Sequence, residues 1–297
     1  MPVVIPLLVV RYHDLFFDDK PMGAVISLSM GPRRFRLDEV LYLAAVERGR
    51  NAEADQYYQQ ICLSLGLTDD PGKSVVHIQA VALLAKQIGQ RLRQITDAGL
   101  YGYLPKWSNF AYDFSTKQVL LTELSTVAEL STLAIENRPL QVLFDIAVMV
   151  YHLVSKFAAP SALDHYQLKH LQHIDPLTEI LTGYFSDLAI ETIRPVARQL
   201  WNAIMPHLFL LKKYRVDIQY DWSNERRRSY KMDFDFFVVL AITVLHPLVN
   251  ASNLAQLYPA KFDRDELMDK AKSYLGEDYD YFHYLLTFNH FKDEPYG

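Results

Sequence analysis

The chain has 297 residues, of which 50% are hydrophobic and 22% charged, and its formal net charge at pH 7 is −5. This composition excludes an intrinsically disordered chain and a strongly basic protein that would attract nucleic acid or anionic membrane through its overall field. The single cysteine, Cys62, excludes an intrachain disulfide framework and favours a reducing compartment, so we expect a cytoplasmic protein.

Two apolar stretches are too short or too interrupted to be membrane spans. The N-terminal one contains Pro6 and is about ten residues long, whereas a span needs roughly 20. The other, Phe236–Val249, is interrupted by His246 and Pro247, which favours a core helix. We therefore expect a soluble protein with no membrane partner.

Two β-strands are predicted at the start of the chain. Residues 3–17 are rich in β-branched and aromatic side chains, residues 18–21 (DDKP) have turn chemistry, and residues 22–30 form a second strand-like run. The first strand is expected to be buried.

Helices follow. Apolar residues at three- and four-residue spacing predict helices over 36–50, 51–67 and 75–98. Gly66 and Gly99 stand where the last two helices are expected to end. Cys62 falls within the second helix and is predicted to be a small buried hydrophobic residue.

The helical rhythm breaks at residues 99–126, where the chain shows a loop and a hairpin with strands "NFAYDF" and "QVLLTEL". The next segment, 138–157, is apolar almost all round and predicts a central buried helix. More helices are expected through Leu211, followed by a hairpin near 214–237 and a helical end. The predicted fold is α+β and predominantly α-helical.

This order of elements resembles the C-terminal lobe of the protein-kinase-like and aminoglycoside-phosphotransferase-like superfamily. The resemblance places Asn109 at the end of the catalytic loop and Glu123 after the hairpin, at the two metal-holding positions of that family. It gives Asp145 the role of the buried acid that braces the catalytic loop.

The resemblance also implies a division of the chain. Residues 1–32 would be residual N-lobe strands and a hinge-like segment, 33–185 the helical C-lobe, and 186–297 a helical extension. Because no linker is visible, one continuous domain is an alternative.

The departures from the family pattern concern catalysis. Leu104 stands where the family has its catalytic Asp, and the chain contains neither a Gly-rich phosphate loop nor the strand Lys that holds phosphate. The resemblance therefore implies a pseudokinase-like protein that is not an enzyme, has no cofactor and acts through protein–protein interaction. The alternative is an atypical phosphotransferase or nucleotidyl-transferring enzyme that uses ATP with magnesium or manganese at Asn109 and Glu123, with its missing lobe supplied by another chain.

A second candidate surface combines arginines with aromatic side chains. Such a combination can bind nucleic acid, because aromatic rings stack on bases and arginines contact phosphates. A helical nucleic-acid-binding protein is therefore a distant alternative. The chain is net acidic and "DFDF" follows at once, so a charged hairpin tip that touches an acidic protein is the favoured interpretation. The residues are Tyr220, Trp222, Arg226, Arg227, Arg228, Tyr230 and Lys231.

Three histidines gather at His165, His170 and His173, with Asp164 beside them. His170 and His173 would share a helix face, but a metal site needs a further well-placed ligand. A polar helix surface is the favoured interpretation, and no metal site is predicted.

Overall fold

The structure is a computed structural model of the chain. The residues that it describes are 6–17, 20–27, 35–37, 40–41, 52–69, 74–101, 107–122, 127–135, 138, 141–143, 145–147, 149–150, 176–200 and 244–254, with 6–17 and 20–27 described by their backbone.

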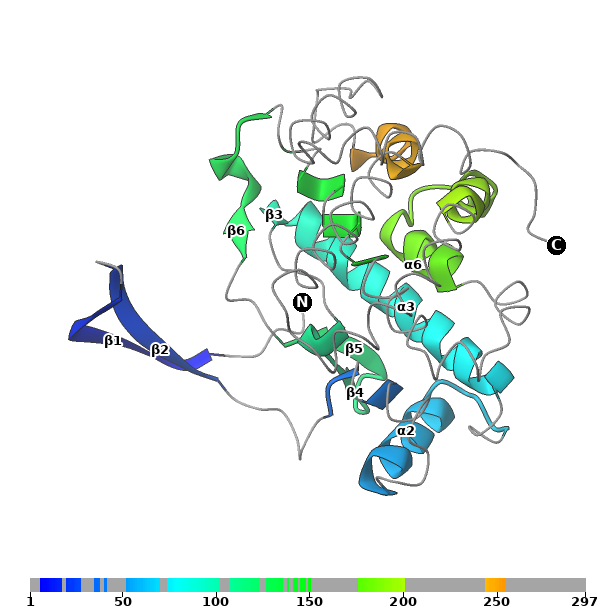
Figure 1. Ribbon diagram of the computed structural model, residues 1–297, viewed down its shortest axis with the longest axis horizontal. Helices are drawn as coiled ribbons and strands as arrows, with labels where there is room; N and C mark the ends of the chain where they lie inside the picture. The colour runs from blue at the N-terminus through cyan, green and yellow to red at the C-terminus, as the bar shows by residue number, and fades with distance from the viewer. Residues whose placement is uncertain are drawn as a thin grey trace, which may run out of the picture.

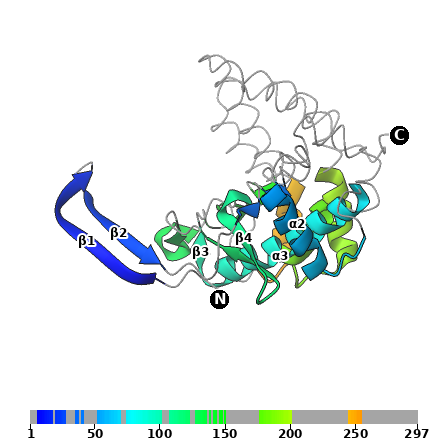
Figure 2. The same cartoon turned by 90° about the horizontal axis from the view of Figure 1, so that it is seen from below.

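The chain begins with a β-hairpin, as predicted. β1 (Pro6–Phe17) pairs antiparallel with β2 (Lys20–Ser27), and Leu8–Arg11 run in regular register against Gly23–Ile26. The turn is shorter than expected because Pro21 lies inside β2, near its start, where a missing N–H is tolerated. Among the described elements, β1 and β2 contact chiefly each other, and Figures 1 and 2 show the hairpin standing away from the labelled helices.

The predicted helix α2 (Ala52–Ser64) is present and ends at its glycine. Gly66 has φ +81°, Leu67 N donates to Cys62 O at 2.9 Å, and Gly66 N donates to Leu63 O at 3.0 Å. This bond pair is the Schellman arrangement that satisfies the last carbonyls of a helix. Cys62 is fully buried, as predicted.

The next helix, α3 (Ser74–Asp97), is also confirmed, and Gly99 follows it with φ +75°. The apolar residues that recur along it at three- and four-residue spacing form a buried face, and Leu83 departs from that face with an exposed fraction of 38%. Leu83 and Leu84 are adjacent, so a turn of about 100° per residue places one of them off the face. The buried members are Ile78, Val81, Leu84, Ile88, Leu92 and Ile95.

The predicted loop and hairpin follow α3. A short 3₁₀ turn, η1 (Trp107–Asn109), leads into β4 (Phe110–Asp113), which pairs antiparallel with β5 (Gln118–Leu121). Lys117, with φ 54°, closes the turn between the strands.

A second small ladder was not predicted. β3 (Leu100–Tyr101) pairs with β6 (Ala128–Glu129), and the 3₁₀ turn η2 (Leu130–Thr132) follows. Two-residue strands are too short to produce an alternating pattern, so the sequence carries no signal for them.

The predicted apolar helices of the second half are confirmed where the structure describes them. Described positions within 138–150 are helical, and α6 (Pro176–Tyr184), residues 190–200 and residues 244–251 are helices. The side chains that these segments bury include Val142, Leu143, Ile146, Ala147, Met149, Val150, Leu177, Ile180, Leu181, Val244, Leu245, Leu248 and Val249.

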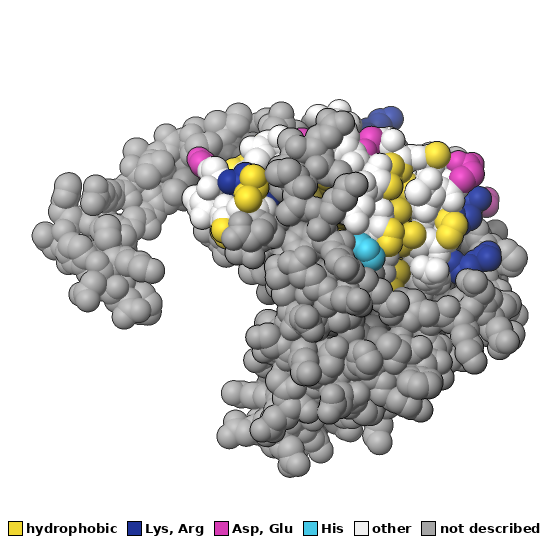
Figure 3. Space-filling view, turned by 90° about the horizontal axis from the view of Figure 1, so that it is seen from above, with side chains coloured by type: hydrophobic (Ala, Val, Ile, Leu, Met, Phe, Trp, Pro, Cys, Tyr) yellow, Lys and Arg dark blue, Asp and Glu magenta, His cyan; other side chains and the backbone are white. Residues whose placement is uncertain are grey.

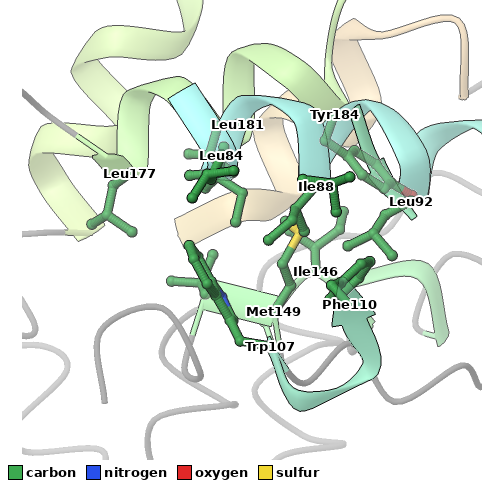
Figure 4. Close-up of a cluster of buried hydrophobic side chains, with 14 of the residues drawn as sticks. Leu84, Ile88, Leu92, Trp107, Phe110, Ile146, Met149, Leu177, Leu181 and Tyr184 are labelled. Carbon is green, nitrogen blue, oxygen red and sulfur yellow. The ribbon is translucent and has the colours of Figure 1, made fainter. Parts of the chain in front are cut away.

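The core forms where α3 meets α6 and the loop that precedes β4. Figure 1 shows α3 running through the middle of the body with α6 beside it. In Figure 4, Leu84 and Ile88 of α3 and Leu181 of α6 gather above Trp107 and other side chains of the core. The described part of the chain is therefore predominantly helical with small antiparallel sheets, which agrees with the predicted α+β class.

Other expectations fall outside the described residues or are not tested by them. The hairpin near 214–237 and the helical C-terminal end lie outside. The division into 1–32, 33–185 and 186–297 stays a prediction.

Candidate functional site

Asn109 is held at the open end of the β4–β5 hairpin, where the two strands begin and finish. It is the last residue of η1, and its side chain is half-buried. Its carbonyl oxygen accepts two hydrogen bonds from Thr122, one from the backbone N at 2.8 Å and one from Oγ1 at 2.9 Å. These bonds extend the β4–β5 pairing by one residue pair and tie the backbone at Asn109 to the end of β5.

The β5 edge of this hairpin is held by polar side chains of α3. Gln87 Oε1 accepts from Val119 N at 2.8 Å, and Arg91 Nε donates to Val119 O at 3.0 Å. Arg91 also bonds the side chain of Gln118. Because Gln87 and Arg91 are four residues apart on one helix face, they replace a neighbouring strand at this edge.

On its other side β4 has a backbone partner. Ala111 forms an antiparallel bridge with Arg36. The hairpin that carries Asn109 is thus fixed on both sides by elements that precede it in the chain.

Trp107 anchors the loop just before Asn109. Its side chain is 1% exposed and belongs to the same buried core cluster as Leu84, Leu177 and Met149 (Figure 4). Within the described residues, the indole N–H has no hydrogen-bond partner. A buried indole of this size fixes where the loop enters the core, because apolar contact area dominates its energetics.

Asp145 is buried, as the resemblance implied, with an exposed fraction of 3%. Its Oδ1 accepts a hydrogen bond from Gln141 Nε2 at 3.0 Å, a neighbour one helical turn earlier. The loop residues that Asp145 would brace, 102–106, lie outside the described part, so its bracing role stays a prediction.

The remaining predicted site residues also lie outside the described part. These are Leu104, Glu123, the histidines His165, His170 and His173, and the basic–aromatic segment from Tyr220 to Lys231. The meeting of Asn109 with Glu123 is therefore still a prediction.

A polar cluster that the sequence did not suggest surrounds Arg93 on α3. Its side chain is 7% exposed, and it donates from Nε to Asp97 Oδ1 at 2.7 Å and from Nη1 to Asp187 Oδ1 at 2.8 Å. Nη1 also reaches the carbonyl oxygen of Tyr184 at 3.1 Å, and Nη2 bonds the side chain of Asn253. One guanidinium thus joins α3, the end of α6 and residues 244–254.

Asp187 completes the ring of contacts, because its Oδ2 accepts from Asn253 N at 2.6 Å. Burial raises the pKa of the Asp187 carboxyl, but the hydrogen bonds from Asn253 and Arg93 outweigh burial and leave its pKa below the ordinary value. Burial lowers the pKa of Arg93, and its bonds to Asp97 and Asp187 more than offset this. Each charged side chain of the cluster is paired with another protein group, which indicates a structural role.

Aromatic side chains attach α2 to the β4–β5 hairpin. Tyr57 lies edge-on to Phe35 and to Phe114, with ring centroids 5.2 Å apart in both pairs. Tyr112 OH bonds Ser64 Oγ at 2.9 Å. Burial raises the pKa of Tyr112, the Ser64 bond lowers it, and the charge of Asp113 raises it, with a net upward shift.

No group of three or more His, Cys, Asp or Glu side chains among the described residues could hold a metal ion. No helix in that part of the chain has the length and apolarity needed to cross a membrane. On the face seen in Figure 3, the described basic and acidic side chains are interspersed with apolar and polar ones.

No protein-family model, curated protein or solved structure matches the chain. The kinase-like resemblance therefore rests on the order of elements and the few motif residues given above.

Proposed function

We propose that this chain is a non-catalytic, kinase-like scaffold that acts by binding another protein chain. The observation that carries the proposal is Leu104, an alkyl side chain at the position where the resemblance places the proton-accepting Asp. A positioned acid–base group is what proton transfer from the substrate hydroxyl needs, and Leu cannot supply it. The single cysteine favours the reducing cytoplasm as its location.

The order of the described elements supports the kinase-like part of the proposal. Helix α3 is followed by η1, which ends at Asn109, and β4 and β5 follow directly; a helical segment with buried Asp145 lies further along the chain. These elements follow one another as the resemblance implies, and the short β3–β6 ladder and η2 are additions to that order.

The β1–β2 hairpin supports the interaction part. It is a two-stranded sheet whose extensive contacts among the described elements are internal. An isolated two-stranded hairpin is marginally stable in water, and its outer backbone edges are templates for a further strand. Adding an extended strand of another chain is a known way to satisfy such edges.

Nucleotide binding is the first test. We expect ATP with magnesium or manganese to leave the thermal unfolding midpoint of the chain unchanged. A ligand present at 100 times its dissociation constant would add about 2.7 kcal/mol to the free energy of unfolding, so binding would be visible.

The variants Asn109→Ala and Glu123→Ala distinguish the scaffold hypothesis from the phosphotransferase hypothesis for this site. Stabilisation of the wild type by metal–ATP that both variants abolish would overturn the scaffold proposal and favour the phosphotransferase alternative. Stabilisation that both variants keep would place the nucleotide elsewhere and would also contradict a scaffold without cofactor.

Partner binding is the second test, and it uses Ala24→Pro in β2. Ala24 pairs with Val10 in the regular part of the hairpin, and proline cannot continue a strand ladder. We expect chains that co-purify with the wild type from its native cells to be lost with Ala24→Pro and kept with Glu191→Gln, a change of an exposed carboxylate outside the hairpin.

Near-UV circular dichroism of each variant shows whether the helical body keeps its packing. If the wild type and Ala24→Pro retain the same partners, the hairpin is not the binding element. If the wild type retains no partner and does not self-associate in light scattering, the interaction proposal fails.

A further inference from the structure

We draw no further inference here: the strongest candidate, the partly exposed aromatic cluster of Phe35, Tyr57 and Phe114 beside the turn between β4 and β5, carries nothing because nothing in the structure shows what covers it.

Discussion

Arg93 joins three segments of the chain through one buried guanidinium. Its partners Asp97, Asp187 and Asn253 are up to 160 residues away in sequence. Buried charges are tolerated when each is paired and hydrogen-bonded, and breaking such a pair leaves an uncompensated charge in the core. The cluster therefore contributes to holding residues 244–254 against α3 and the end of α6.

Replacing Asp187 with Asn should lower the free energy of unfolding at neutral pH by about 1–3 kcal/mol, because bonds to a charged partner are lost. The pKa of Asp187 is lowered in the folded protein from an ordinary value of 3.8. Its stabilising contribution is therefore present above that ordinary value and is lost as the pH falls through the folded pKa.

Denaturant unfolding of the wild type and Asp187→Asn between pH 7 and pH 3 checks this prediction. The difference between the two free energies should be constant near neutral pH and shrink below about pH 4, where the Asp187 carboxyl becomes protonated first in the unfolded chain and only at lower pH in the folded protein. Glu191→Gln, which removes an exposed carboxylate, is the matched control. A difference between wild type and Asp187→Asn that grows on acidification would contradict the assigned direction of the pKa.

At the scale of elements, α3 and α6 approach closely through two glycines. A Cβ at Gly89 would overlap the carbonyl oxygen of Ile180 and lie 2.8 Å from Tyr184 N. A Cβ at Gly183 would likewise overlap the carbonyl oxygen of Lys86. The obstructing atoms belong to helix backbones, which cannot move without separating the helices.

Gly89→Ala should therefore destabilise the protein by about 1–3 kcal/mol, the usual cost of overpacking a core. In an exposed helix the same change would stabilise the protein by about 1 kcal/mol. A destabilising effect would therefore show that Gly89 lies against the backbone of α6. Chemical denaturation measures it, with Gln90→Ala at the exposed neighbouring position as control. Stabilisation by Gly89→Ala would show that the two helices are farther apart than described.

At the scale of the whole molecule, the helical body of the described chain is stabilised by many buried contacts, whereas the β1–β2 hairpin is stabilised mainly by contacts between its own two strands. The amides of α3 lie in a core shared with α6 and the loop before β4. Those of β1 and β2 depend on a two-stranded ladder. Local opening is easiest where few buried contacts oppose it.

Hydrogen exchange should therefore be much faster at the amides of Gly23–Ile26 than at those of Ile88–Leu92. Exchange followed by mass spectrometry on the chain without a partner tests this ordering. Equal protection would mean that the hairpin is stabilised by contacts beyond its own ladder. Protection that falls on dilution would identify those contacts as self-association.

Local sequence patterns were sufficient to predict the helices, whose apolar residues recur with a regular spacing, and the glycines that end them. Gly66 and Gly99 have the positive φ expected after a helix, and the 3.6-residue spacing identified the buried face of α3. Strand-like composition and turn chemistry located the first hairpin, and the break in helical periodicity with two β-like runs around a turn located the second. The position of Asn109 just before the second hairpin could be predicted because it depends only on residues that are its neighbours in the chain.

The class of fold and the position of the loop and hairpin followed from the sequence alone, as did the presence of Leu104 at the position where the resemblance places a proton-accepting Asp. Tertiary packing sets the partners of Arg93, the contacts by which Gln87 and Arg91 take the place of a strand beside β5, and the close approach of Gly89 to α6. Periodicity depends on near neighbours in the chain, whereas these contacts join residues whose separation in sequence leaves no repeating pattern. They form only when the packing of the core brings them together.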